Sequence, residues 1–436
     1  MPEYRVSRPS GRSLRVRGLA LLAATLVTVT GCATRGEVTE EQSAGGPSVA
    51  YGASQEEYAE ALADMEPVTL QMQSSAPQGA ATGRRFEAYA EALQEWSGGK
   101  INVEIAFSNS IAQPADVDDA LGDGRLDLGS VTPNSEPARY PAHAALWDMA
   151  FLGRQTPVDG LLQFHAAYLE ASRTVPEINS EFAAQGITLL VPAFSSGSTG
   201  MMCSEPRRDL AGLRGAAVAT LARTQNLEVE AVGGSPTSLT YAELYESLER
   251  GVVQCAMASL TVASLQGYIP AAPHMVIDDE VGFQVSGAAF GVSTSVWNSL
   301  PLAAQQLMYD RLDVFLVATF ESALDNITNG LTQVRDSGGE VAGLDPEAKA
   351  AVEAAHEQVL QTAAQNDQVA DPAAMVESVQ QAEEKWAGVL EEMGYRDTPS
   401  YDTFLDEYQP GSIDFDPFIE RLYSEVLLAD RPGAAS

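Results

Sequence analysis

Alternating apolar and polar residues predict strands over residues 68–72, 101–107 and 126–131. Between these segments, apolar residues recur at helical spacing over 82–97 and 116–122, which predicts two helices. Alternation of strand and helix is typical of a parallel sheet whose strands are joined by right-handed crossovers. The sequence therefore predicts an α/β fold for this part of the chain.

Small and polar residues follow the first and the third predicted strands. Ser74 and Ser75 come after the first, and Thr132 and Asn134 come after the third. Ligands of parallel sheets bind beyond the carboxyl ends of the strands, so these four side chains are candidate ligand contacts. Trp147 follows further along the chain, and its indole ring either forms a wall of this site or packs in the core.

A second α/β unit is predicted to begin near Gly186. Its predicted strands cover residues 187–191, 200–203, 216–220 and 252–257, and its predicted helices cover 224–232 and 240–250. After Pro301 the apolar spacing becomes mostly helical. Long amphipathic helices are expected over residues 302–333, 346–365 and 372–393.

The N-terminal pattern predicts an export signal. Five arginines and one glutamate precede an apolar run from Leu19 to Val29, and small residues then lead to Cys32. This is the layout of a secretory signal, and its end resembles a bacterial lipobox, in which the thiol of Cys32 is acylated. The apolar run is shorter than the roughly 20 residues that span a bilayer. We therefore expect residues 1–31 to be a cleaved lipoprotein signal, with an uncleaved N-terminal anchor as the alternative.

Residues 32–66 are expected to form a lipidated tether. The segment is polar and rich in glycine and glutamate, so it is not expected to bury a core, although a short helix is predicted over 56–65. Ordered structure is expected to start at Pro67. A chain of this kind would work outside the cytoplasm, anchored to the cell membrane by its lipid.

A formal net charge of −35 restricts the partners of the chain. Phosphate backbones repel so acidic a protein, so nucleic acid is not expected as a partner. The four histidines are scattered and none pairs at ligand spacing, so neither a metal nor another cofactor is expected. Besides Cys32 the chain has only Cys203 and Cys255, which are expected to form a disulfide in an oxidising compartment. Two buried free thiols are the alternative.

Five segments resemble, in order, the motifs of one known family. They are Ser97–Val103, Leu121–Gly129, Asp209–Gly215, Gly233–Val253, and Trp297 with Leu300 and Pro301. The family is the solute receptor of TRAP transporters, of the dicarboxylate-receptor (DctP) type, and the resemblance extends over about residues 67–390. It implies a two-lobed periplasmic-binding fold of type II, with hinge strands and long C-terminal helices. Such a receptor closes on a small organic solute and docks on membrane permease subunits, and it is expected to be a monomer.

On this resemblance, residues 67–195 form the first lobe and residues 196–290 the second, and residues 291–436 form a helical segment across both lobes and a C-terminal tail. The expected function is that of an extracytoplasmic solute-binding lipoprotein. The receptor of an ATP-driven importer and a ligand-sensing lipoprotein without transport are the alternatives. An enzyme is not expected, and no catalytic residue is assigned, because the chain contains no Gly-x-Ser-x-Gly, HExxH or P-loop motif.

The chain departs from the family where the family grips its ligand. The family's ligand-binding arginine aligns with Ala219, and Arg223 is the nearest substitute. A strand end that carries an acid and an amide in the family has Met257 and Ser259 here, and Met202 lies in a segment that often carries a second arginine. Burying a carboxylate without a partner is costly, so we expect a solute less charged than a dicarboxylate. The alternative is that Arg223 does the usual job of gripping a carboxylate.

Two further candidate ligand residues, Tyr241 and Glu243, begin the helix of the best-matched motif. The Glu243 carboxylate either contacts a hydroxyl or amine of the solute or caps its own helix.

Overall fold

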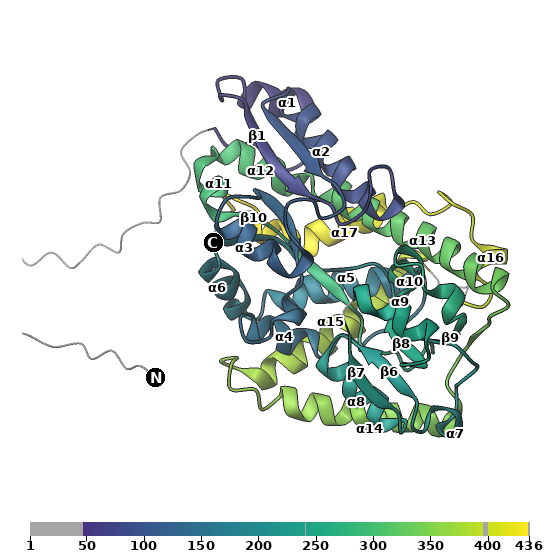
Figure 1. Cartoon of the computed structure of the whole chain (residues 1–436). Coiled ribbons are helices and arrows are strands. Elements are labelled where there is room, and N and C mark those ends of the chain that lie inside the picture. The colour runs from purple at the N-terminus through teal and green to yellow at the C-terminus, as the bar shows by residue number, and fades with distance from the viewer. Residues whose placement is uncertain (1–46, 240, 396–399, 435–436) are drawn as a thin grey trace, which may run out of the picture. The chain divides into compact units, whose positions relative to one another are not determined.

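The computed structural model describes residues 47–239, 241–395 and 400–434, and the side chains of residues 241 and 242 lie outside this described part. Two β-sheets with helices packed on them make up the described chain (Figure 1). The predicted α/β class is therefore confirmed.

The first sheet has the strand order β2-β1-β3-β10-β4. Its strands are β1 (Val68–Gln73), β2 (Ile101–Ala106), β3 (Leu128–Val131), β4 (Ile187–Ser195) and β10 (Gly287–Ser293). Strands β1, β2 and β3 are parallel, as predicted, whereas β10 runs antiparallel to both β3 and β4. The sheet is mixed because β10 enters it from a later part of the chain.

Several helices accompany the first sheet. They are α1 (Gln55–Ala61), α2 (Arg84–Trp96), α3 (Val117–Gly122), α4 (Pro141–Trp147), α5 (Asp159–Ser172), α6 (Pro176–Ala184), α11 (Thr294–Ser299) and α12 (Leu302–Asp310). In α2 the predicted apolar face is buried, and the rings of Phe86 and Tyr89 pack against Phe290 of β10. These contacts fix α2 to the centre of the sheet.

The second sheet has the strand order β11-β9-β5-β8-β6-β7. Its strands are β5 (Gly200–Cys203), β6 (Ala217–Thr220), β7 (Ser235–Ser238), β8 (Cys255–Ala258), β9 (His274–Val276) and β11 (Val341–Ala342). The helices α7 (Leu210–Leu213), α8 (Arg223–Ala231), α9 (Tyr241–Glu249) and α10 (Leu260–Leu265) belong to this half. Strand β6 is parallel to β7 and β8, while β5 is antiparallel to β8 and β9.

Two connections that lie side by side lead directly from one sheet to the other, and the helices after β10 form a third link, because they lead to β11 of the second sheet. Residues 196–199 lead from β4 to β5, and residues 277–286 lead from β9 to β10. Thr199 and Phe283 pair in an isolated antiparallel bridge between them. Residues 287–290, which were expected in the second lobe, belong to the first sheet, because β10 hydrogen-bonds to both β3 and β4.

Long helices return to both halves after β10. The 25-residue helix α13 (Leu312–Asp336) contacts α2 in the first half and α10 in the second. Further on, α14 (Pro346–Ala363) packs on α8, and α15 (Pro372–Met393) packs on α5 (Figure 1). Two short helices follow, α16 (Phe404–Glu407) and α17 (Asp416–Glu425).

The single helix expected over 302–333 is two helices, α12 and α13, that meet at Arg311. The Arg311 guanidinium lies over the ring of Trp96, 3.7 Å from its centroid, and also pairs with Asp313. These tertiary contacts hold the chain at the break.

Residues 47–62 are folded, so the prediction of a tether that continues to residue 66 is wrong. Helix α1 begins with a capping box, in which the side chains of Ser54 and Glu57 each accept a hydrogen bond from the other's backbone N–H. Tyr58 and Leu62, four residues apart, are buried. The short helix predicted over 56–65 is present as α1, but its polar composition did not reveal that two buried side chains attach it to the fold. Residues 1–46, with the predicted signal and Cys32, lie outside the described residues.

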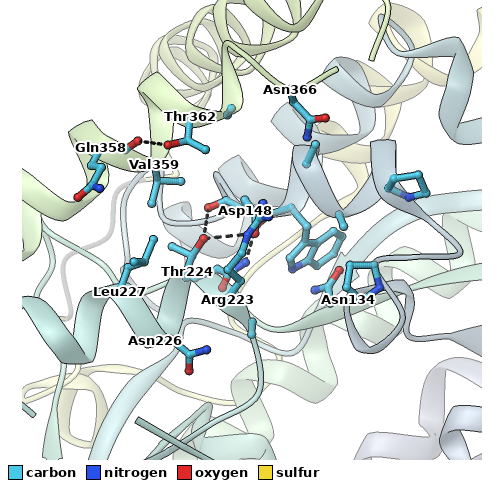
Figure 2. Close-up of a pocket in the computed structure, with 18 of the residues that line it drawn as sticks. Asn134, Asp148, Arg223, Thr224, Asn226, Leu227, Gln358, Val359, Thr362 and Asn366 are labelled. Atoms are coloured by element: carbon cyan, nitrogen blue, oxygen red, sulfur yellow. Dashed lines mark hydrogen bonds and ion pairs between the residues drawn. The ribbon is translucent and has the colours of Figure 1, made fainter. Parts of the chain in front are cut away.

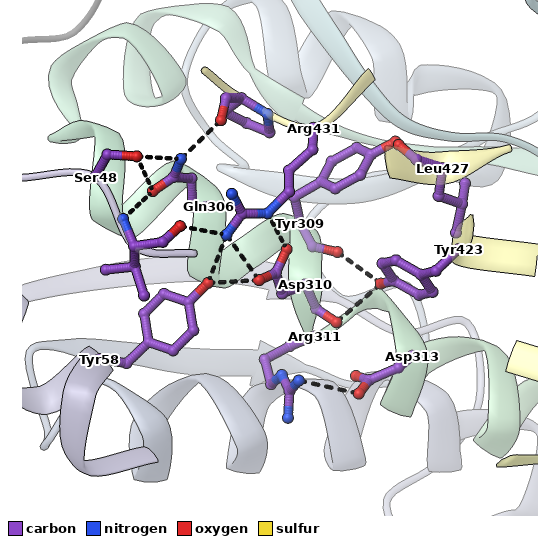
Figure 3. Close-up of polar contacts among 12 residues, drawn as sticks. Ser48, Tyr58, Gln306, Tyr309, Asp310, Arg311, Asp313, Tyr423, Leu427 and Arg431 are labelled. Atoms are coloured by element: carbon purple, nitrogen blue, oxygen red, sulfur yellow. Dashed lines mark hydrogen bonds and ion pairs between the residues drawn. The ribbon is translucent and has the colours of Figure 1, made fainter. Parts of the chain in front are cut away.

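Both ends of the described chain are fastened to α12 by a polar cluster, the terminal clamp, formed by Ser48, Val49, Tyr58, Gln306, Asp310, Arg431 and Pro432 (Figure 3). The Asp310 carboxylate accepts two hydrogen bonds from Arg431, at 2.7 and 2.9 Å, and one from the Tyr58 hydroxyl at 2.5 Å. The Gln306 side chain accepts from the Val49 N–H and donates to the Pro432 carbonyl. The clamp joins segments more than 370 residues apart, because Arg431 also donates to the Val49 carbonyl.

Cys203 of β5 and Cys255 of β8 form a disulfide, as predicted. The two residues face each other in neighbouring antiparallel strands, and both are buried. The bond spans a sequence separation of 52 residues that contains α7, β6, α8, β7 and α9. It therefore closes most of the second sheet into one covalent loop.

Replacing Arg431 with methionine is expected to lower the free energy of unfolding by about 3–5 kcal/mol, because the Asp310 carboxylate is then left buried without its cation. Urea unfolding measures the loss. Arg421→Met is the matched control: Arg421 is exposed and its partner Glu425 keeps a second cation in Lys385, so the loss should change the stability by less than about 1 kcal/mol. If Arg431→Met lowers the free energy of unfolding by no more than about 1 kcal/mol, as expected for the control, the terminal clamp does not stabilise the fold.

A double variant, Cys203→Ala with Cys255→Ala, is expected to lose about 4 kcal/mol of stability on the chain-entropy estimate for a loop of this length. The same loss should appear when the wild-type protein is unfolded in a reductant, whereas the double variant should not respond to the reductant. A wild-type protein that unfolds identically with and without reductant would contradict the prediction.

Candidate functional site

A pocket of about 1080 Å³ lies where segments of both halves meet (Figure 2). Its walls come from residues 134–148 after β3, from residues 220–227 after β6, and from residues 358–368 at the end of α14 and beyond. Ser238 at the end of β7 and Gln284 in the second connection complete the lining. The pocket therefore lies beyond the carboxyl ends of β3, β6 and β7, where a ligand site is expected.

An ion pair crosses the pocket wall from one half to the other. The Arg223 guanidinium pairs with the Asp148 carboxylate, and the Thr224 hydroxyl donates to the Asp148 carbonyl at 3.0 Å (Figure 2). Asp148 caps the C-terminal end of α4, and Arg223 is the first residue of α8. The side chain of Asp148 is 10% exposed and that of Arg223 is 68% exposed, so one partner is buried and the other faces water.

Burial raises the pKa of Asp148 above its ordinary value, while Arg223 and the hydrogen bond from Thr224 oppose this rise. The carboxylate also accepts a hydrogen bond from Thr224 in the first turn of α8, where the helix dipole favours a negative charge. The ion pair with Arg223 and the hydrogen bond from Thr224 compensate for part of the hydration free energy that the Asp148 carboxylate loses on burial.

Trp147 both lines the pocket and packs in the core, so the two interpretations of this residue are compatible. Its indole N–H donates to the Val285 carbonyl at 2.8 Å, and its ring stacks on His143 at 5.3 Å. A Cβ atom at Gly287 would lie 2.5 Å from the indole ring. Only glycine at position 287 therefore leaves room for this wall.

A buried polar layer supports the pocket from the side of the second connection. The Gln284 backbone N–H donates to Glu228 at 2.8 Å, and its side-chain amide donates to the Trp147 carbonyl at 2.9 Å. Glu228 is also bonded to His356 of α14, and burial raises the pKa of Glu228. The layer therefore holds α4, α8 and α14 in register around the pocket.

Charged groups are scarce in the pocket lining. Among the described residues that line it, only Asp148, Arg223 and Asp367 are charged, and the sole cation of these three is already paired. Carboxamides predominate among the other polar side chains, contributed by Asn134, Asn226, Gln284, Gln358, Gln361, Gln365, Asn366 and Gln368. The lining suits a polar solute that forms many hydrogen bonds.

Three of the predicted ligand residues line this pocket: Asn134, Trp147 and Arg223. Ala219 and Met257 are buried in the interior of the second sheet and do not line it. Met202 is buried in β5, between β8 and β9. Alignment on short motifs placed these residues at strand positions, whereas the side chains that reach the pocket follow the end of β6.

The other predicted contacts have different surroundings, and the lining of the pocket does not include them. The Ser74 hydroxyl is buried and accepts from the backbone N–H of Ala76, while the neighbouring Ser75 is exposed. The Thr132 hydroxyl accepts from Ser135. Ser259 caps α10 through the N–H of Val262.

Glu243 is exposed in the first turn of α9 and does not line the pocket. Tyr241 begins the same helix, and its side chain lies outside the described part of the chain.

Sequence reasoning missed Asp148 and the wall formed by residues 358–368. Asp148 is adjacent in the sequence to Trp147, a predicted ligand residue, and only this adjacency could have indicated that Asp148 lines the pocket. The third wall carried no signal, because its position depends on the packing of α14 against α8.

A second cation, Arg85, is buried elsewhere in the first half. One of its amino groups donates to the Ser196 hydroxyl at 3.2 Å, and the guanidinium lies 5.2 Å from the ring centroid of Phe194. Two of its nitrogens have no hydrogen-bond partner, and burial lowers its pKa to about 10, with no carboxylate of the described residues near enough to oppose this. Arg85 does not line the pocket.

The described residues contain no group of three or more His, Cys, Asp or Glu side chains arranged to hold a metal ion. Among the helices that are described, none combines the length and the apolar character needed to cross a membrane.

The chain matches the family of bacterial extracellular solute-binding proteins, family 7, over residues 72–367, and it belongs to that family. The fold is shared with solved structures of TRAP periplasmic solute-binding proteins. One, from Roseobacter denitrificans with bound β-D-glucuronate, has 16% sequence identity and a TM-score of 0.59, over 72% of this chain and 99% of that chain. A second, from a marine metagenome with pyroglutamate, has 13% identity and a TM-score of 0.62, over 74% and 100%. A third, from Desulfovibrio desulfuricans with sn-glycerol-3-phosphate, has 16% identity and a TM-score of 0.61, over 72% and 97%.

Proposed function

We propose that this chain is the receptor of a TRAP-type secondary transporter, which captures a small organic solute outside the cytoplasm and delivers it to membrane permease subunits. The observation that carries the proposal is a pocket lined from both sheets, in a chain that belongs to a family of extracellular solute-binding proteins. The volume of about 1080 Å³ is of the size that small-molecule sites have.

The connections between the sheets suit a receptor that opens and closes. Residues 196–199 and 277–286 are short and adjacent, so small changes of their backbone angles would rotate one sheet relative to the other. Such a rotation would separate Asp148 from Arg223 and Thr224 and so open the pocket. Binding of a solute would shift the population toward the closed arrangement.

The solved relatives support a small organic solute, because their structures contain a uronate, pyroglutamate or glycerol phosphate. A role in binding and not in catalysis agrees with the family, and we propose that the chain is not an enzyme. A monomer and a lipid anchor at Cys32 complete the proposal. The buried disulfide supports an oxidising compartment.

Lipid attachment at Cys32 is tested by metabolic labelling with a fatty-acid analogue. The wild-type protein should take up the label and stay with the membrane fraction, whereas Cys32→Ser should lose both properties. Membrane retention of an unlabelled protein would instead indicate an uncleaved anchor.

A chain that starts at residue 33 keeps every described residue and is expected to be stabilised by its solute. A ligand at 100 times its dissociation constant should raise the free energy of unfolding by about 2.7 kcal/mol. Thermal unfolding is measured against uronates, aromatic acids, pyroglutamate, glycerol 3-phosphate, neutral sugars, polyols, amines and zwitterions.

Leu227→Trp should abolish the stabilisation by filling the pocket, which Leu227 lines. Val252→Trp is the control, because Val252 is 61% exposed and lies outside the lining. Stabilisation that survives Leu227→Trp would place the solute elsewhere. If no solute class stabilises the protein, the receptor function is contradicted.

A further inference from the structure

We propose that Asp148 is a built-in carboxylate that occupies the pocket's anion site, so that the receptor selects solutes which carry no net negative charge and present N–H or O–H donors. The inference rests on the proposed function and specifies the chemical class of its solute. It makes Asp148 a specificity-determining residue of the pocket.

The place that Asp148 occupies has the properties of an anion site. A guanidinium and the N-terminal end of a nine-residue helix, α8, converge there. Each of these features attracts carboxylates and phosphates, the first by charge and the second by its dipole. The Asp148 carboxylate, from the other half of the chain, pairs with that guanidinium (Figure 2).

The remaining described lining offers no second cation for an acid. Arg223 is the one cation among the described lining residues, and Asp367 adds another carboxylate. The formal charge of the lining is thus negative, in a chain of net charge −35. An acidic solute would have to share the Arg223 guanidinium with the Asp148 carboxylate, at the cost of repulsion between the two acids.

Acceptors in and behind the wall lack donors. The side-chain carbonyl of Gln284 is buried without a hydrogen-bond partner, and its orientation is fixed because the amide nitrogen of the same side chain donates to Trp147. The side-chain oxygen of Asn134 is also buried without a partner. The Gln284 and Asn134 oxygens are enclosed in the wall and add to its negative potential, so hydroxyl or amino groups of a solute suit this wall and the Asp148 carboxylate better than a second acid does.

The test compares three probes that share one ring and differ in charge: D-glucuronate, D-glucose and D-glucosamine. Acetate, compared with chloride at equal ionic strength, tests whether an arginine side chain is free to bind a carboxylate. Stabilisation of the chain from residue 33 is measured for the wild type, for Asp148→Asn and for Asp148→Asn with Arg223→Gln. Circular dichroism confirms that each variant is folded.

Neither acetate nor D-glucuronate is expected to stabilise the wild-type protein. Asp148→Asn should bind both about tenfold or more tightly than the wild type, because Arg223 becomes free to make charge-assisted hydrogen bonds. The double variant should lose this gain. Arg85→Met should leave all of these results unchanged, since Arg85 does not line the pocket.

Acetate or uronate binding by the wild type that equals binding by Asp148→Asn would overturn the inference. Uronate binding that depends on Arg85 would also overturn it, because the acid would then be held at a different cation. If Asp148→Asn does not fold, Arg223→Gln is compared with the wild type instead. Neither protein is expected to bind a carboxylate. Carboxylate binding by the wild type that Arg223→Gln loses would overturn the inference.

Failure of the inference and failure of the proposed function give different results. A wild-type protein stabilised by an acidic solute remains a receptor, although Asp148 does not set its selectivity. A wild type that no solute class stabilises contradicts the receptor function itself, whatever acetate does to the Asp148 variant.

Discussion

The antiparallel pairing of β10 with β4 is the constraint on which the rest of the structure depends. Strand β4 carries the chain out of the first sheet, and β10 brings it back next to β4. Because the two strands are neighbours, the two connections to the second sheet start side by side, and the bridge between Thr199 and Phe283 continues the pairing into them. The second sheet is thus joined to the first through this pair of segments and, after β10, through the helices that lead to β11.

This attachment brings the carboxyl ends of β3 and β6 to a common pocket. The first sheet contributes Trp147 and Asp148, and the second contributes Arg223 and Thr224. Residues 358–368, which end α14 and lead toward α15, supply the third wall. The helices after β10 therefore do more than cover the sheets, since they limit the space in which a solute binds.

The charges in this pocket are arranged differently from those of a receptor whose arginine is free to bind an acidic solute. A guanidinium at the N-terminal end of a helix is a natural place for a carboxylate, and here the protein itself supplies the carboxylate. The same pair links the two halves of the chain, together with the hydrogen bond from Thr224 to Asp148. The terminal clamp and the disulfide lie in other parts of the fold and hold each half together independently of this contact.

The sequence by itself determined the elements whose signal is local. Period-two alternation located β1 and β2, helical spacing located α2 and α15, and the two remaining cysteines indicated their disulfide, because each pattern reflects residues close in the chain or the oxidation state of a compartment. Tertiary structure alone decided that β10 joins the first sheet, that residues 47–62 attach to the rest of the fold, and that Asp148 reaches Arg223. These outcomes depend on contacts between residues 75 to more than 250 positions apart, where no periodic pattern extends. Local propensity therefore specified part of the strands and helices, and packing between distant segments specified the pocket and its charge.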